Sequence, residues 1–272
     1  MSEPRRRAEL AEYARRLHAR GWVANHDGNA SVREGEGRYL ATPTATSKAA
    51  VTAESLLVVD EAGAKVAGPG KPFSEIGLHL TVYRNRPDVN AVIHAHPPTA
   101  TGFAVAGVGL DEPLLPEAVV SLGPGIPTVP PAAPGPAACQ VLAPLTGAHD
   151  AVLLGGHGVL TWGVDLEQAY LRMELVEHLA KIALVARQLG GARPVAPALL
   201  PALLEARRKA GLGQPAPAPA EPAKKVVVAC APAPPGSDVE VYDPKRSKAA
   251  VLPSPGDLAA IIRQEIANAL KK

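Results

Sequence analysis

The sequence has few cysteines, few aromatic residues and almost no net charge. Its two cysteines, Cys139 and Cys230, lie far apart among 272 residues. A disulfide-stabilised scaffold is therefore not expected, and a reducing cytosol is the expected compartment. A formal net charge of +2 gives no reason to expect nucleic acid or a charged membrane surface as a partner. No apolar run reaches the roughly 18 residues that a membrane span needs, and residues 1–7 lack the apolar stretch of a signal peptide behind them.

Two histidines separated by one residue follow a short apolar segment. Residues 89–93 are mostly apolar and β-branched, which predicts a buried strand. Because successive side chains on a strand point to opposite faces, His94 and His96 are expected to share one face. A third histidine, His157, lies in a glycine-flanked turn after a second apolar segment, residues 151–154. Three imidazoles with an open coordination position are typical of a catalytic metal site, whereas structural zinc is usually held by four protein ligands.

An acidic residue, Glu75, lies at the predicted start of a helix that ends near Arg86. Ser74 is a candidate cap for this helix, and an acid in the first turn interacts favourably with the helix dipole. These features alone would explain Glu75 structurally. Alternatively, the helix N-terminus binds phosphate while the carboxylate faces the metal. His79, one turn further on, is predicted to be a buried, hydrogen-bonded residue rather than a ligand.

The loop at residues 25–31 is rich in Gly, Asn and Asp, and a strand is expected from Val32. Small residues allow backbone N–H groups to approach an anion, and the Asn29 side chain can also donate a hydrogen bond. As a bare pattern this stretch is also typical of an ordinary turn. Further short strands are predicted at residues 38–41 and 56–60. Several short strands this early favour an antiparallel or mixed sheet over a regular βαβ repeat.

Three other segments complete the pattern. Residues 9–20 and 165–189 have apolar residues at helical spacing, which predicts two packing helices. Residues 110–138 are dense in Pro and Gly, which predicts loops and short edge strands of the kind that carry substrate specificity.

Five motifs occur in one order along the chain, at residues 27–33, 42–44, 74–75, 94–97 and 157–163. Together they resemble the class II sugar-phosphate aldolase and epimerase family, which includes fuculose-phosphate aldolase, ribulose-phosphate 4-epimerase and the adducin head domain. The resemblance covers about residues 8–190. It implies an α/β fold with three layers (α/β/α) around a central, mostly antiparallel sheet. It also implies a homotetramer with its sites at subunit interfaces.

The resemblance also assigns roles to residues. It implies zinc or another divalent metal held by His94, His96 and His157, with Glu75 as a further ligand of the resting metal and as the catalytic acid/base. It places Asn29, Thr44 and Ser74 in the phosphate and substrate pocket. Relatives usually have glycine where this chain has Ala45 and a second serine where it has Phe73, so the chain departs from the family at two positions of that pocket.

The predicted function is a zinc-dependent aldolase acting on a sugar phosphate. The expected substrate is a ketose 1-phosphate such as L-fuculose or L-rhamnulose 1-phosphate, cleaved to dihydroxyacetone phosphate and lactaldehyde. Glu75 favours this branch, because the epimerases typically carry aspartate there. Two alternatives remain: a pentulose-phosphate 4-epimerase with the same metal, and a non-catalytic binding module of the adducin type.

The composition changes near residue 212. Residues 1–211 are expected to form the catalytic domain, and the Pro- and Ala-rich residues 212–253 an extended linker. Residues 254–272 have a helix-start pattern at Ser254 followed by an apolar stripe, which predicts a short amphipathic helix that is stable when docked. This segment is similar to the encapsulation peptides that load enzymes into bacterial microcompartments, and implies shell or core proteins as partners. The alternative is that it packs on its own or a neighbouring subunit.

Overall fold

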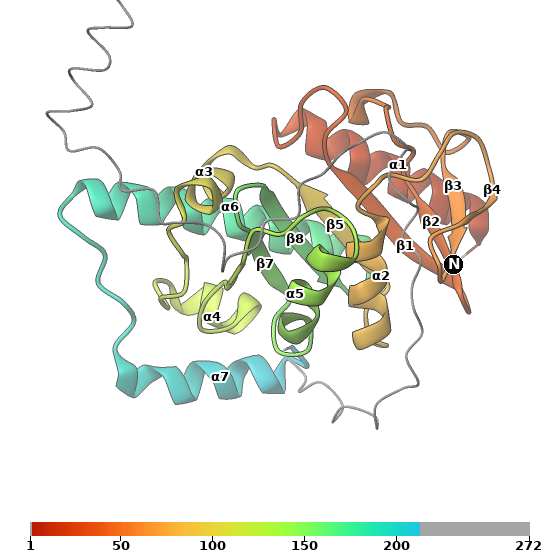
Figure 1. The fold of residues 1–272 in the computed structure, drawn as a ribbon. Coiled ribbons are helices and arrows are strands. Elements are labelled where there is room, and N and C mark those ends of the chain that lie inside the picture. Colours follow the sequence, from red (N-terminus) through yellow and green to blue (C-terminus); the bar gives the residue numbers. More distant parts are fainter. Residues whose placement is uncertain (1, 213–272) are drawn as a thin grey trace, which may run out of the picture. The chain divides into compact units, whose positions relative to one another are not determined.

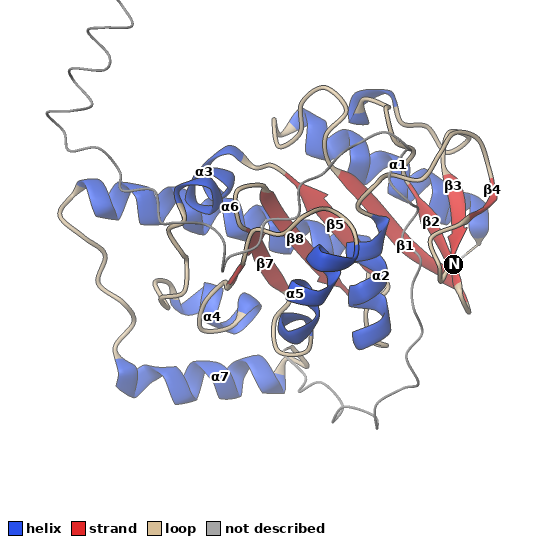
Figure 2. Cartoon of the chain, in the orientation of Figure 1, coloured by secondary structure: helices blue, strands red, loops and turns tan. Residues whose placement is uncertain are grey.

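The computed structural model describes residues 2–212, which belong to one compact unit (Figure 1). Within this unit an eight-stranded sheet lies between two layers of helices (Figure 2). Among these residues, no helix is both long and apolar enough to cross a lipid bilayer. The predicted linker and terminal helix lie outside the described residues, apart from the first linker residue, Leu212.

The sheet is mixed but mostly antiparallel, as expected. Its strand order is β4-β3-β2-β1-β5-β8-β7-β6, and every neighbouring pair is antiparallel except β6 and β7. The strands are β1 (Asn29–Gly35), β2 (Arg38–Ala41), β3 (Leu57–Asp60), β4 (Lys65–Ala67), β5 (Ala91–Ala95), β6 (Thr128–Val129), β7 (Ala151–Leu154) and β8 (Gly158–Gly163). β5, which leads into the histidine pair, pairs with β1 on one side and β8 on the other.

Helices cover both faces of the sheet. They are α1 (Glu3–Ala19), α2 (Ile76–Asn85), α3 (Pro98–Ala106), α4 (Pro116–Leu122), α5 (Pro136–Thr146), α6 (Leu166–Gln188) and α7 (Leu200–Lys209), with the 3-10 turns η1 (Lys48–Ala50) and η2 (Pro197–Leu199). One apolar core joins the sheet to α1, α3, α4 and α6, and a second joins it to α2 and α5. Alternation along β5 sends Ile93 to the first core and Val92 to the second. His94 is two residues after Val92 and therefore points to the same face as α2.

Some predictions from the sequence were wrong about local structure. The Pro- and Gly-rich stretch contains helix α4 and the start of α5, because Pro116 and Pro136 occupy the first turn of each helix, where a missing N–H costs nothing. β6 is an edge strand, as predicted. Ser74 does not cap α2: the N-cap is Glu75, and no side chain caps this helix. The first helix begins at Glu3 rather than at residue 9.

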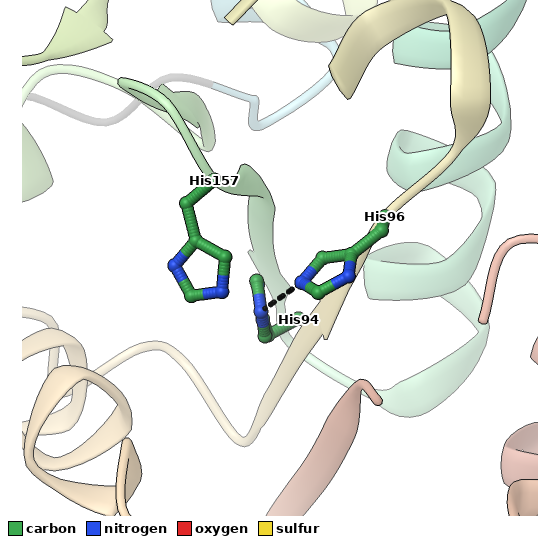
Figure 3. A group of neighbouring side chains, drawn as sticks. All are labelled: His94, His96 and His157. Carbon is green, nitrogen blue, oxygen red and sulfur yellow. Dashed lines mark hydrogen bonds between the residues drawn. The ribbon is translucent and has the colours of Figure 1, made fainter. Parts of the chain in front are cut away.

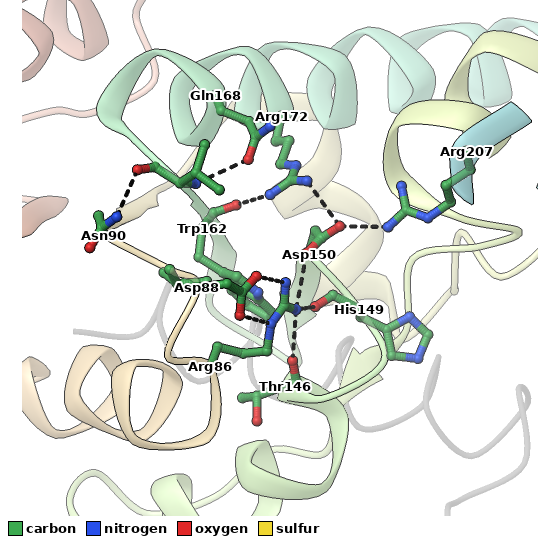
Figure 4. A network of polar contacts seen from close by, with 12 residues as sticks. Arg86, Asp88, Asn90, Thr146, His149, Asp150, Trp162, Gln168, Arg172 and Arg207 are labelled. Atoms are coloured by element: carbon green, nitrogen blue, oxygen red, sulfur yellow. Dashed lines mark hydrogen bonds and ion pairs between the residues drawn. The ribbon is translucent and has the colours of Figure 1, made fainter. Parts of the chain in front are cut away.

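A buried ionic network (Figure 4) lies at the start of β7, the opposite end of this strand from His157. Asp150, just before β7, pairs with Arg86 at 3.1 Å, with Arg172 at 3.0 Å and with Arg207 at 2.5 Å. Asp88 accepts two hydrogen bonds from the same guanidinium group of Arg86. Arg86 directly follows α2, Arg172 belongs to α6 and Arg207 to α7, so this carboxylate joins three helices at the end of the sheet where β7 begins.

Candidate metal centre

Three histidines meet where β5 and β7 end (Figure 3). His94 belongs to β5, His96 follows that strand, and His157 lies in the turn between β7 and β8. One ring nitrogen of each lies within 4.8 Å of the others. The Nε2 atoms of His94 and His96 are 3.0 Å apart. The site is open on one side, because 42% of the His157 side chain is exposed, whereas that of His94 is buried. The expected convergence of the three histidines is confirmed.

Glu75 brings a carboxylate to the same centre from the start of α2. Its Oε2 is 3.5 Å from His94 Nε2, and its Oε1 is 3.3 Å from His157 Nε2. Asn29, at the start of β1, donates a hydrogen bond of 2.9 Å from Nδ2 to Glu75 Oε2. The carboxylate therefore spans two imidazoles while an amide fixes its orientation.

These residues fit a divalent cation. Ligand atoms at about 2.0–2.1 Å from a tetrahedral zinc lie about 3.3 Å from each other. Three spacings at this centre are close to that value: 3.0 Å between the Nε2 atoms of His94 and His96, and 3.5 and 3.3 Å from the Glu75 oxygens to His94 and His157. His94 Nδ1 is 2.9 Å from the carbonyl oxygen of Val159, so this ring nitrogen carries the proton and Nε2 presents its lone pair. The donor set of three imidazoles and one carboxylate is the kind that zinc prefers.

Electrostatics favour the protonation states that a cation needs. Burial is the main cause that lowers the pKa of His94 to about 4, and the neighbouring imidazoles lower it further against the opposing effect of Glu75. Burial also lowers the pKa of His96. Burial alone would raise the pKa of Glu75, but the nearby histidines, His94 first, and the hydrogen bond from Asn29 together bring that pKa below its ordinary value. Near neutral pH the rings of His94 and His96 are therefore neutral ligands and Glu75 is a carboxylate.

A glycine makes the close approach of the rings possible. A Cβ on Gly158 would lie 2.5 Å from Cδ2 of His96, 2.7 Å from the carbonyl oxygen of Ala95 and 3.2 Å from Cε1 of His94. Any side chain at this position would displace the histidines. Nearby, Gly156 adopts a left-handed backbone with φ of +70°, which glycine allows without strain, and this turn presents His157.

The three residues predicted to bind phosphate differ in their exposure to solvent. Asn29 is buried and bonded to Glu75, while Thr44 and Ser74 are exposed. Ala45 has a left-handed φ of +53°, a conformation that favours the glycine typical of relatives. Phe73 is buried with its ring centroid 4.9 Å from that of His79, so it belongs to the core. The roles of Asn29, Thr44 and Ser74 remain predictions.

A cavity of about 160 Å³ adjoins the metal centre. Ser74, Glu75 and His157 contribute to its wall at one end. The rest of the lining is mostly apolar and comes from α2, from β6 and the loop after it, from α5 and from the end of β7 (Leu78, Val129, Pro130, Ala132, Pro134, Ala138, Leu154). Neither lysine nor arginine lines this cavity within residues 2–212.

Two neighbouring residues have contacts that the sequence did not reveal. Asp27 Oδ2 is 3.4 Å from Nδ1 of His96. Lys48 is buried and donates to the carbonyl oxygens of His26 and Thr46. Asp27 lies in one of the motifs, but its contact with His96 joins a loop to a strand end about 70 residues away and leaves no local signal.

Residues 8–184 match the family described as Class II Aldolase and Adducin N-terminal domain. The chain belongs to this family. The match covers the whole sheet and both histidine segments, and the three-histidine cluster is of the kind typical of a divalent metal site in this family.

Individual relatives carry different activities. The chain is 34% identical to 3-oxo-tetronate 4-phosphate decarboxylase of Pectobacterium atrosepticum over 190 residues. The matched region covers 68% of this chain and 86% of the relative. The chain is 34% identical over 176 residues to L-fuculose phosphate aldolase of Methanococcus vannielii, which covers 64% and 93%. The crystal structure of L-fuculose-1-phosphate aldolase from Thermus thermophilus superposes with a TM-score of 0.60 at 30% identity, over 70% of this chain and 99% of that one.

Proposed function

We propose that this member of the family is a metal-dependent aldolase that cleaves a ketose 1-phosphate to dihydroxyacetone phosphate and an aldehyde. L-fuculose or L-rhamnulose 1-phosphate, which would yield lactaldehyde, is the proposed substrate. The observation that carries the proposal is the meeting of three imidazoles with the carboxylate of Glu75, whose oxygens lie 3.3 and 3.5 Å from two of them. A binding module would have no need of such a cluster beside a cavity.

The proposed metal ligands are His94, His96 and His157. A divalent cation bound there, zinc by the donor set, would supply Lewis-acid stabilisation of negative charge on the ketose carbonyl oxygen. In the cleavage, the bond between C3 and C4 breaks, the C4 hydroxyl loses a proton and C3 gains one. Glu75 is the proposed acid/base that moves the proton at C3. Its side chain is 21% exposed, so a substrate can reach it, and Asn29 holds it in place.

The phosphate is proposed to bind near the start of α2. The first N–H groups of a helix have no partner within the helix and attract anions. Ser74 lies just before this helix, and the backbone N–H of Thr44 donates to Lys71, which brings its loop beside the segment leading to Ser74. Asn29, Thr44 and Ser74 are the side chains proposed to take part.

The lining of the cavity supports a substrate with an apolar end. Beyond Glu75 and His157 its wall is mostly apolar and carries no cationic side chain. Such a wall suits the methyl-bearing fragment of a 6-deoxyketose, which becomes lactaldehyde, because burying a methyl group there loses no hydrogen bond.

A second candidate activity is decarboxylation of a 3-oxo acid phosphate. It is favoured by the similarity to 3-oxo-tetronate 4-phosphate decarboxylase. In that chemistry the bond between C1 and C2, next to the C3 carbonyl, breaks. Carbon dioxide leaves in place of an aldehyde, and C2 gains a proton. The same ligands and the same Glu75 would serve both reactions.

A product assay tests these proposals. The metal-loaded protein is incubated with L-fuculose 1-phosphate, L-rhamnulose 1-phosphate and 3-oxo-tetronate 4-phosphate, and dihydroxyacetone phosphate is coupled to NADH oxidation. Glu75→Gln is expected to lose at least a hundredfold in rate, in line with the loss of general acid/base catalysis. Glu117→Gln, an exposed acid on α4, is the matched control.

Release of aldehyde supports the aldolase, and release of carbon dioxide alone supports the decarboxylase. A parallel incubation with a pentulose phosphate tests the epimerase alternative, which formation of the C4 epimer would favour.

We also propose a homotetramer and a targeting role for residues 254–272. The family resemblance supports the first, and light scattering on the full chain tests it, with a monomer as the contradictory result. The sequence pattern supports the second. Fusion of residues 254–272 to a fluorescent protein, in cells that make a microcompartment shell, tests it by encapsulation, and diffuse fluorescence would refute it.

A further inference from the structure

We propose that Asp27 is a positioning residue that orients His96 as a metal ligand. This rests on the metal centre of the proposed function. Asp27 Oδ2 is 3.4 Å from His96 Nδ1, while Nε2 on the other side of the same ring is 3.0 Å from His94 Nε2. The imidazole of His96 therefore lies between a carboxylate and the centre of the cluster.

This arrangement is what a metal-bound imidazole requires. The ring nitrogen that does not bind the metal donates its N–H to a carboxylate or a carbonyl oxygen, which fixes the tautomer and the ring orientation. His94 uses the carbonyl oxygen of Val159, at 2.9 Å. For His96 the partner is the charged Asp27, which makes the imidazole a more basic ligand than a carbonyl partner would.

The loop that carries Asp27 is attached directly to the strand of the histidines. The N–H of His96 donates to the carbonyl oxygen of Trp22 at 2.8 Å, where the loop begins. Where it ends, Gly28 has a φ of +66°, and a Cβ there would overlap Val23 and lie 3.1 Å from the carbonyl oxygen of His94. Both ends of the loop therefore lie against the backbone of the two ligands.

Lys48 holds the middle of this loop. Its ammonium group is buried and donates to the carbonyl oxygen of His26 at 3.3 Å and to that of Thr46 at 2.7 Å. No carboxylate lies within 4 Å of this ammonium among residues 2–212, so its bonds serve to join two backbone segments. Asp27, the next residue after His26, is thus presented to His96 from a fixed backbone.

The test measures metal affinity rather than turnover. Metal-free wild-type protein, Asp27→Asn and Asp27→Ala are titrated with Zn²⁺ in competition with a chelator of known affinity. Asp27→Ala is expected to bind Zn²⁺ about 10- to 100-fold more weakly, the usual effect of removing such a partner. Asp27→Asn should lose less, because its amide oxygen still accepts the imidazole N–H. Glu36→Gln, an exposed acid in the turn between β1 and β2, is the matched control and should bind as wild type does.

The absorption spectrum of the Co²⁺-loaded protein and the thermal unfolding of the metal-free protein complete the test. A positioning role predicts an altered Co²⁺ spectrum in Asp27→Ala with an unchanged unfolding temperature of the metal-free form. Equal affinities in all variants, or a loss that follows a lower unfolding temperature, would overturn the inference. Zn²⁺ binding by the wild type with weaker binding by Asp27→Ala supports it even if no sugar phosphate is cleaved. Failure of the wild type to bind Zn²⁺ would overturn both proposals.

Discussion

Burial lowers the pKa of His94 and holds its ring neutral near pH 7, which has a consequence for stability. In the unfolded chain a histidine takes up a proton near pH 6.5, but in the folded protein the pKa of His94 is lowered to about 4. Between these two values the unfolded state binds more protons, so the free energy of unfolding falls as the pH falls. We therefore expect the metal-free protein to lose stability from about pH 6.5 down to about pH 4, with no contribution from His94 above pH 7.

Urea unfolding of the metal-free protein at several pH values measures this effect. His94→Asn should show a shallower loss below pH 6.5, whereas His18→Asn, an exposed residue of α1, should keep the wild-type slope. An unchanged slope in His94→Asn would contradict the assignment of the effect to His94.

Ala45 is a second residue with a measurable cost. Its φ of +53° places a Cβ in the left-handed region, at a cost of about 1–2 kcal/mol. Ala45→Gly removes this cost but adds backbone freedom to the unfolded chain, so a net gain of up to about 1 kcal/mol is expected. Ala49→Gly, in η1, has only the entropic penalty and should destabilise. Chemical denaturation gives the free energy of unfolding of both variants and of the wild type. A destabilised Ala45→Gly would show that the strain is absent.

Between elements, the tight contact of β8 with the end of β5 should control metal binding. Gly158→Ala would place a methyl group against the rings of His94 and His96, so we expect at least a tenfold loss of Zn²⁺ affinity. Gly102→Ala is the control, because nothing lies within 4 Å of a Cβ at that position of α3. That variant should keep full affinity and gain stability through helix propensity. Competition titration against a chelator gives both values, and wild-type affinity in Gly158→Ala would refute the contact.

Regular elements with clear periodicity could be predicted from the sequence, and the others could not. The strand at residues 151–154 and the long helix α6 were predicted correctly to within a residue or two, because their apolar residues recur at the spacing of a strand or a helix. α4 and the start of α5 were missed because proline was taken to exclude helix in a stretch where it occupies first turns. The rest of α5, which contains Pro144, lies beyond that stretch and was not predicted. No helix was predicted at residues 200–209, although Leu200, Leu203 and Leu204 recur there at helical spacing.

The candidate site divides in a similar way. The alternation of a strand predicts that His94 and His96 share a face, and the motif order adds His157 and Glu75. The contact of Asp27 with His96 could not be predicted, because it depends on how a loop packs against a strand end. The core position of Phe73 was also invisible, since only the fold shows that its ring lies against His79.

For the molecule as a whole, the buried carboxylate of Asp150 joins α7 to the sheet. Three guanidinium groups share it, so Asp150→Asn leaves buried cations without their partner and should cost at least about 3 kcal/mol. Arg207→Met should cost less, because Asp150 keeps two partners and repulsion among the arginines falls. Arg208→Met, an exposed neighbour paired only with Glu205, should cost no more than about 1 kcal/mol.

Chemical denaturation measures this order. Because the network lies at the opposite end of β7 from His157, Arg207→Met should also retain the Zn²⁺ affinity of the wild type. A larger loss in Arg207→Met than in Asp150→Asn would contradict the shared role of the carboxylate.

The dependence of turnover on bound metal tests the central claim most directly. Chelator-treated protein is reloaded with increasing Zn²⁺, and release of dihydroxyacetone phosphate from L-fuculose and L-rhamnulose 1-phosphate is measured at each loading. The account predicts no cleavage without metal and a rate that rises in proportion to bound Zn²⁺ and levels off at one ion per chain. Cleavage by the metal-free protein, or full loading without any cleavage of either sugar phosphate, would contradict it.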